Sequence, residues 1–166
     1  MIHSYVPFYH EILIANRPKL VFEWGPGPNT DLALKYGASV TTVEQNLKWM
    51  PKPKPNLTCL HISTKDPSYT NPVSFKDFDV FFVDSRRRAE CIINAFKECK
   101  DTAIVCLHDA ERSWYRKAIN LFPYKKFYKN KPGSKWIRSG DGHDGSRTLF
   151  CVMSKSKMRL NTKQFI

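Results

Sequence analysis

The sequence predicts an α/β fold in which helices cover both faces of a mainly parallel, seven-stranded sheet. Three observations predict this fold. Short apolar runs alternate with segments of helical length along most of the 166 residues, which is the pattern of parallel strands joined by helices. A glycine-rich turn joins the first strand-like run to the next helix. The last two runs follow one another without a helix between them, which predicts an antiparallel hairpin at the sheet edge.

The first half of the chain is expected to begin with a helix and to continue with alternating strands and a second helix. Phe8, Ile12 and Ala15 recur with helical period, and Gly37 is the type of residue that ends a helix. Three prolines between residues 51 and 55 exclude a long helix before the third strand. The expected ranges are a helix at 5–16, a strand at 20–23, a helix at 30–36, and strands at 39–43 and 57–62.

The second half continues the alternation after a loop-like segment at 63–72. The run VFFV suits a buried central strand, and Cys91, Ile92, Ala95 and Phe96 recur with helical period. The expected ranges are a strand at 79–83, a helix at 89–97, a strand at 102–107, a helix at 113–122, and strands at 125–128 and 147–153.

Composition excludes several classes of protein. A chain with 42% hydrophobic and 25% charged residues suits one globular domain rather than a collagen, a coiled coil or a disordered tail. Its apolar runs are too short to span a bilayer, and the amino terminus lacks the pattern of a signal peptide, so we expect a cytoplasmic protein without a membrane partner. The five cysteines include no CxxC pair, which argues against a structural zinc site.

The net charge of +12 is distributed unequally along the chain. Residues 1–111 hold 13 basic and 13 acidic residues, whereas residues 112–166 hold 14 basic residues against Asp141 and Asp144. A local excess of this size predicts an anionic partner for the last third of the chain.

The most specific motif is VFEWGPGPNT, residues 21–30. Gly25 and Gly27 allow a tight turn between a strand and a helix, with room for a ligand against the main chain. Glu44 closes the next strand, 17 residues after Gly27, where a carboxylate can accept hydrogen bonds from both ribose hydroxyls. Together they predict a nucleoside site. Thr30 stands where a dinucleotide-binding turn has its third glycine, which disfavours a nicotinamide cofactor.

This turn resembles the first motif of class I S-adenosylmethionine-dependent methyltransferases, and the resemblance extends over residues 18–154. VEQNLKW matches the acidic end of their second strand, FDVFFVDSR their fourth strand and IVCLHD their fifth. The resemblance implies a three-layer αβα Rossmann-like sandwich and S-adenosylmethionine as the methyl donor. The expected organisation is a single minimal domain, 1–166, with an N-terminal helix at 5–16, a cofactor half at 18–84, an acceptor half at 85–154 and a basic tail at 155–166.

The resemblance also implies which residues bind the donor. Glu23 would face the ammonium of the methionine part, Glu44 would bind the ribose, and Gln45 or the loop at 63–66 would edge the adenine. The residues expected to bind the donor are Glu23, Gly25, Pro26, Gly27, Asn29, Thr30, Glu44, Gln45 and Asp84.

Three candidate catalytic side chains, Asp84, His108 and Asp109, follow the fourth and fifth strands, whose ends share one crevice in such a sheet. Two interpretations stay open. Asp84 with His108 or Asp109 holds a divalent cation, as in catechol-type O-methyltransferases, although Ala110 replaces the asparagine of that family. Alternatively, His108 or Asp109 acts directly as a base. Asp109 also suits the N-cap of a helix that begins near Glu111.

The methyl acceptor is expected to be anionic. Three consecutive arginines after Asp84 oppose the dipole of the helix that they begin, and a bound phosphate or carboxylate would offset this. The residues expected to bind the acceptor are Arg86, Arg87, Arg88, Arg112 and Trp136.

The expected function is methyl transfer from S-adenosylmethionine to oxygen or nitrogen of an anionic small molecule or a nucleic acid. The alternative is a catalytically silent S-adenosylmethionine-binding module that binds nucleic acid through its basic C-terminal third. The sequence leaves the acceptor and the oligomeric state open.

Overall fold

The computed structural model describes residues 5–129 and 149–158. Its strands are β1 Leu20–Trp24, β2 Ser39–Glu44, β3 Leu57–His61, β4 Val80–Val83, β5 Ile104–Leu107, β6 Tyr124–Lys129 and β7 Leu149–Ser154. They form one sheet in the order β3-β2-β1-β4-β5-β7-β6. The first five strands are parallel, and β7 runs antiparallel to both β5 and β6. The predicted fold class and the antiparallel pair at the sheet edge are confirmed.

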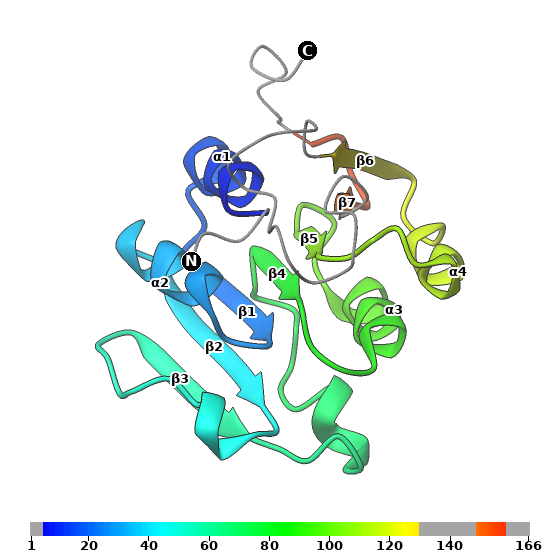
Figure 1. The fold of residues 1–166 in the computed structure, drawn as a ribbon. Helices are drawn as coiled ribbons and strands as arrows, with labels where there is room; N and C mark the ends of the chain where they lie inside the picture. The colour runs from blue at the N-terminus through cyan, green and yellow to red at the C-terminus, as the bar shows by residue number, and fades with distance from the viewer. Residues whose placement is uncertain (1–4, 130–148, 159–166) are drawn as a thin grey trace, which may run out of the picture.

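Helices cover both faces of the sheet (Figure 1). Helices α1 (Val6–Asn16) and α2 (Pro28–Lys35) pack on one face, and α3 (Arg88–Glu98) and the short α4 (Arg116–Ile119) pack on the other. Three 3-10 helices also occur: η1 Leu47–Trp49, η2 Pro67–Thr70 and η3 Ser113–Tyr115.

Strand β4 shows why the sequence forms a three-layer structure. Val80 and Phe82 pack in the core under α1 and α2, whereas Phe81 and Val83 pack in the core under α3 and α4. All four side chains are buried because β4 is a central strand with helices above and below it. The continuous apolar run therefore serves two cores.

Two predicted segments differ from the structure. The helix expected at 113–122 is instead η3 followed by the four-residue α4, and Pro123 disfavours helical backbone at the residue before it. The segment expected to be a loop at 63–72 contains η2, because Asp66 caps it by accepting a hydrogen bond from the Ser68 amide at 2.8 Å.

Across residues 5–129 and 149–158, no helix combines the length and the apolar character that a bilayer crossing requires.

Candidate functional site

The turn between β1 and α2 packs against the ends of two neighbouring strands. Gly25 has a φ of +93°, and its amide donates to the Val43 carbonyl of β2 at 3.1 Å. A Cβ atom at Gly25 would lie 2.6 Å from the carbonyl oxygen of Asp84, which directly follows β4. Gly25 is therefore required both by its backbone conformation and by the close approach of another backbone.

Side chains of the turn hold it in place. The Thr30 hydroxyl accepts from the Gly27 amide at 3.0 Å and donates to Glu23 at 2.6 Å. Asn29 donates to the Gly25 carbonyl at 3.3 Å and accepts from the Tyr5 hydroxyl at 2.9 Å. The polar groups of this turn therefore bond to one another and to the chain just before α1.

Glu23 lies beneath the turn and is completely buried. Burial raises the pKa of this carboxyl to about 8, although the hydrogen bond from Thr30 acts in the opposite direction. Its Oε2 atom accepts from Thr30, and its Oε1 atom has no hydrogen-bond partner among the described residues. The contact that we expected between Glu23 and an ammonium group stays a prediction.

Glu44 ends β2 next to the turn and is 4% exposed. Its Oε1 atom accepts from the Asn46 amide at 2.7 Å, and no hydrogen bond to Oε2 is formed within the described part of the chain. The carbonyl of Gln45 lies 2.9 Å from Nε2 of His61, at the end of β3. One Glu44 oxygen is thus held by the backbone, which leaves the other with accepting capacity at the carboxyl edge of the sheet.

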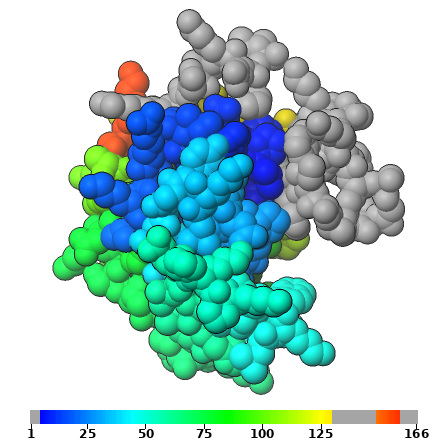
Figure 2. Space-filling view, turned by 90° about the vertical axis from the view of Figure 1, so that its left-hand side faces the viewer, coloured from blue at the N-terminus to red at the C-terminus, as the bar shows by residue number. Residues whose placement is uncertain are grey.

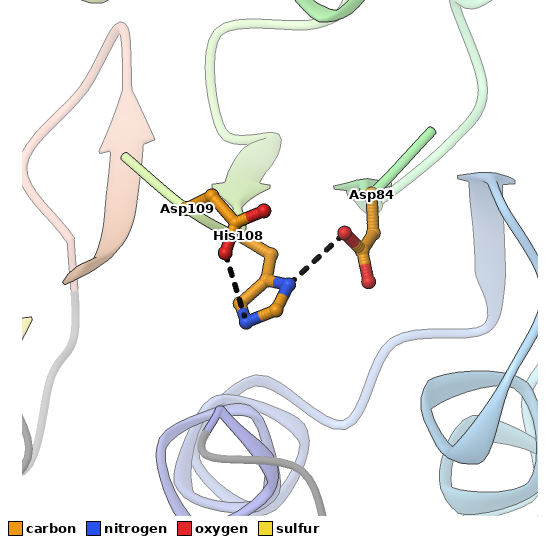
Figure 3. Close-up of side chains that lie close together, drawn as sticks. All are labelled: Asp84, His108 and Asp109. Atoms are coloured by element: carbon orange, nitrogen blue, oxygen red, sulfur yellow. Dashed lines mark hydrogen bonds and ion pairs between the residues drawn. The ribbon is translucent and has the colours of Figure 1, made fainter. Parts of the chain in front are cut away.

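The ends of β4 and β5 bring Asp84, His108 and Asp109 together, as predicted (Figure 3). The His108 ring lies between the two carboxylates. Its Nδ1 atom is 3.0 Å from Asp84 Oδ1, and its Nε2 atom is 3.6 Å from Asp109 Oδ1. The ring of Tyr5 packs edge-on against the imidazole, with 4.7 Å between ring centroids. No pattern in the sequence indicates this contact, because an aromatic residue at the start of a helix usually belongs to the core.

Arg88 completes this cluster. Its guanidinium donates to Asp84 Oδ1 at 2.9 Å and to Asp109 Oδ2 at 2.8 Å. It also donates to the carbonyls of Ser85 and His108 at 2.8 and 2.9 Å. Only 11% of the Arg88 side chain is exposed, and these four protein groups take up most of its hydrogen-bonding capacity.

The charges of the cluster control its protonation. Burial opposes the charged form of His108, but the hydrogen bond and charge of Asp84, together with Asp109, outweigh it and raise the pKa of the imidazole. Burial likewise opposes ionisation of Asp109, but His108 and Arg88 outweigh it and lower the pKa of that carboxyl. The geometry therefore favours an ionised Asp109 and stabilises the imidazolium form of His108.

The ligand atoms of Asp84, His108 and Asp109 lie within 4.8 Å of one another, which is close enough for a metal site, but Arg88 already bridges the two carboxylates. Asp84 Oδ1 already accepts from both Arg88 and His108, and Asp109 Oδ2 accepts from Arg88 and, at 3.3 Å, from Arg112. A metal ion bridging the two carboxylates would have to approach the guanidinium that already bridges them, and like charges at that separation repel strongly in a partly buried site. The charge already present in the cluster therefore disfavours a divalent cation between the carboxylates.

The expected N-cap role of Asp109 is wrong. The next helix begins at Ser113, and its N-cap residue is Arg112. Asp109 instead adopts a left-handed backbone conformation, with φ +56°, and its carboxylate accepts hydrogen bonds from Arg88 and Arg112.

The residues expected to bind the acceptor lie in different surroundings. Arg87 donates to Glu90 and to the carbonyls of Thr64 and Asp66 at 3.2 and 3.1 Å. Arg86 is exposed and makes no side-chain hydrogen bond or ion pair to the described residues. Arg112 lies 5.9 Å from the ring centroid of Trp114, whereas Trp136 lies outside the described residues. The anions that offset the charges of Arg87 and Arg88 are thus the protein's own.

A groove of about 630 Å³ begins beside the turn, between α2 and the proline-rich segment after η1. Figure 2 shows α2 and the segment that follows β2 side by side on one face of the molecule. Pro26, Gly27 and Thr30 line the end of the groove at the turn, and Trp49, which is 69% exposed, lines its far side.

Comparison with known proteins identifies the fold. No protein-family model and no curated protein matches this chain. Among solved structures, the tRNA (m1A58) methyltransferase TrmI from Aquifex aeolicus is 18% identical, with a TM-score of 0.67. The match covers 95% of this chain and 71% of the TrmI chain. Spermidine synthase from Thermotoga maritima is 14% identical (TM-score 0.65); 89% of this chain matches 56% of that protein.

A putative caffeoyl-CoA O-methyltransferase from Staphylococcus aureus is also similar, at 11% identity and a TM-score of 0.64, over 93% of this chain and 84% of that one. The chain spans little more than half of the spermidine synthase. These likenesses show that the chain has the class I methyltransferase fold.

Proposed function

We propose that this chain binds S-adenosylmethionine between the turn at residues 25–30 and Glu44, and transfers its methyl group to oxygen or nitrogen of an anionic acceptor. The fold supports the proposal, because several similar structures are methyltransferases with different substrates. It also agrees with the general rule that ligands of open α/β sheets bind outside the carboxyl ends of the strands.

The observation that carries the proposal is the state of Glu44. This carboxylate is almost fully buried beside a glycine turn, yet only one of its oxygens accepts a hydrogen bond from the described protein. The other oxygen, Oε2, is not among the fully buried atoms that lack a partner within the described residues, so it can accept hydrogen bonds from a bound ligand. The two hydroxyls of a ribose would donate such bonds, while the Asn46 amide keeps the carboxylate in place.

The cluster at the ends of β4 and β5 supports the transfer step. The donor, when bound, supplies a methyl group on a positively charged sulfur, which leaves as a neutral thioether when a lone pair of the acceptor attacks the methyl carbon. The acceptor must also lose its proton. In the neutral His108, Nδ1–H donates to Asp84, so Nε2 accepts that proton, and the nearby Asp109 carboxylate stabilises the resulting imidazolium.

Two of the expected acceptor-binding arginines retain that proposed role. Arg86 is exposed next to Asp84, and Arg112 lies beside Asp109 with 44% of its side chain exposed. Arg112, which bonds to Asp109, would attract a phosphate or carboxylate near His108, and the exposed Arg86 would add positive charge to this end of the sheet. Arg87 and Arg88 are held by protein groups, so we assign them to the support of the site.

The alternative interpretation, a catalytically silent module that binds nucleic acid, is supported by charge alone. Six of the fourteen basic residues in the last third lie outside the described residues, and no contact of the other eight singles out a nucleic acid. These six are Lys131, Lys135, Arg138, Arg147, Arg159 and Lys163.

Calorimetric titration of S-adenosylmethionine into the wild type and Glu44→Gln tests the donor site. The amide can still accept from Asn46 but has lost the charge that strengthens bonds from the ribose. A hydrogen bond to a charged group contributes about 1.5–3 kcal/mol, so the affinity is expected to fall roughly tenfold to a hundredfold. Asp101→Asn is the matched control, because the Asp101 side chain is 85% exposed and remote from this edge.

Equal affinities for Glu44→Gln and the wild type would contradict the ribose contact. Failure of the wild type to bind the donor would overturn the proposed function as a whole. Incorporation of a labelled methyl group into an anionic acceptor, lost in His108→Gln, is the expected sign of the reaction itself.

A further inference from the structure

The Arg88 side chain donates hydrogen bonds to both Asp84 and Asp109, the two carboxylates on either side of His108. It reaches them from the first turn of α3, whereas the two carboxylates follow β4 and β5. Its Nε atom also donates to the Ser85 carbonyl, and its Nη1 atom to the His108 carbonyl. One buried cation therefore links both strand ends to the helix between them.

Two carboxylates this close together need a positive charge between them. A divalent cation supplies that charge in many enzymes, but it must be acquired from solution. A guanidinium stays charged at all accessible pH values, and its planar set of donors matches carboxylate oxygens in fixed directions. It can therefore neutralise the pair and orient it at the same time.

We propose that Arg88 is the fixed cation of this site, a positioning residue that takes the place of a divalent ion and holds Asp84 and Asp109 on either side of His108. The site then works without a metal. Its carboxylates are kept ionised and oriented by a group that belongs to the chain itself.

The backbone on both sides of the cluster agrees with this assignment. Arg87 and Asp109 adopt left-handed conformations, with φ of +51° and +56°, which are uncommon for residues other than glycine. Such conformations persist where surrounding contacts determine them. Here the turns that they form precede α3 and follow β5, and the Arg88 guanidinium bridges the two.

The inference rests on the proposed function for the role of the cluster in catalysis, but its test needs neither donor nor acceptor. After treatment with a chelator, the protein is titrated with Mn²⁺, and the free ion is followed by electron paramagnetic resonance. The wild type is expected to bind no Mn²⁺ at micromolar concentrations. Arg88→Gln removes the charge and frees both carboxylates, so its affinity for Mn²⁺ is expected to rise roughly tenfold or more.

Three further variants make the result specific. Arg88→Lys retains the positive charge and is expected to bind as little Mn²⁺ as the wild type. Lys97→Gln removes an exposed charge from the last turn of α3 and is expected to leave Mn²⁺ binding unchanged. Combining Arg88→Gln with Asp84→Asn is expected to abolish the gain, which places the ion at the carboxylate pair.

The inference would be overturned if the wild type bound Mn²⁺ at micromolar concentrations and Asp84→Asn removed this binding. This comparison tests the inference even if Arg88→Gln does not fold. A folded Arg88→Gln without any gain in Mn²⁺ affinity, or an equal gain in Arg88→Lys, would also overturn it. If the donor also binds, methyl transfer by the wild type is expected to be unaffected by the chelator. If the wild type does not bind the donor but the variants bind Mn²⁺ as expected, the result would count against the proposed function and not against the role of Arg88.

Discussion

Glu23 shows how strongly a single residue depends on its surroundings. The carboxyl is completely buried, and its Oε1 atom has no partner among the described residues. The hydroxyls of Tyr9 and Thr42 share this property within the described ranges, and Thr42 lies opposite Glu23 in the register of β1 and β2. With a pKa of about 8, Glu23 is mainly neutral at neutral pH. A neutral carboxyl is a weak partner for an ammonium group, so its position favours support of the turn through Thr30.

The raised pKa of Glu23 predicts a particular dependence of stability on pH. The folded protein keeps a proton between the usual pKa of 4.5 and the folded value of about 8, whereas the unfolded chain loses it. The contribution of Glu23 to stability is therefore fully present below the lower value and is lost as the pH rises through the higher one.

Glu23→Gln removes this titration. Relative to the wild type, the variant is expected to gain about 4 kcal/mol of stability as the pH rises from about 5 to about 9. Urea unfolding at both pH values measures the difference. Asp77→Asn serves as the control, because Asp77 is exposed and its side chain forms no hydrogen bond to the described residues. Parallel pH profiles for Glu23→Gln and the wild type would show that Glu23 ionises normally.

At the scale of elements, the turn before α2 joins three strands. Gly25 contacts the ends of β2 and β4 through its backbone, and this leaves no room for a side chain. Gly37, after α2, has a similar φ of +82°, but a Cβ atom there would meet nothing within 4 Å. Substitutions at the two glycines therefore distinguish the cost of a left-handed backbone conformation from the cost of a steric clash.

Gly37→Ala is expected to destabilise the fold by about 1 kcal/mol, since only the left-handed conformation opposes it. Gly25→Ala adds a collision with the Asp84 carbonyl, for a total expected loss of roughly 2–4 kcal/mol. Urea unfolding of both variants tests this difference, and calorimetry tests whether Gly25→Ala also weakens donor binding. Equal losses of stability in the two variants would show that the strand ends move apart easily.

At the scale of the whole molecule, Asp79 connects the predicted cofactor half with the predicted acceptor half. Its side chain accepts from the amides of Lys19 and Leu20 at 2.7 and 3.0 Å, at the start of β1. It also accepts from the ammonium of Lys100, in the connection between α3 and β5, at 2.6 Å. These contacts lie at the edge of the sheet opposite the candidate site.

Asp79→Asn is expected to destabilise the protein by about 2 kcal/mol at neutral pH, because a carboxylate bonded to three donors is replaced by a neutral amide. The contacts with Lys100 and the two amides outweigh burial and lower the pKa of Asp79. Its contribution is thus present above the usual value of 3.8 and is lost as the pH falls through the lower folded value.

Thermal and urea unfolding of Asp79→Asn and Asp77→Asn measure this contribution. The Asp77 side chain forms no hydrogen bond within the described chain, so its variant controls for the loss of one negative charge. Equal stability of the two variants would mean that Asp79 does not join the halves. The structural role of Asp79 would also be contradicted if Asp79→Asn strongly weakened donor binding without changing the stability.

The sequence by itself determined the order of elements, the parallel sheet with its antiparallel edge, and the convergence of Asp84, His108 and Asp109. These follow from local patterns: apolar runs define strands, glycines define turns, and parallel strands place their carboxyl ends at one edge. Only the tertiary structure decided the partners of the charged groups. From the sequence, we expected the three arginines to bind an anion of the acceptor. In the structure, Arg88 lies in the first turn of α3 and contacts two carboxylates of the chain itself. The physical reason is that ion pairs depend on distances between side chains in the folded molecule. Periodicity along the sequence does not predict which charged side chains become neighbours.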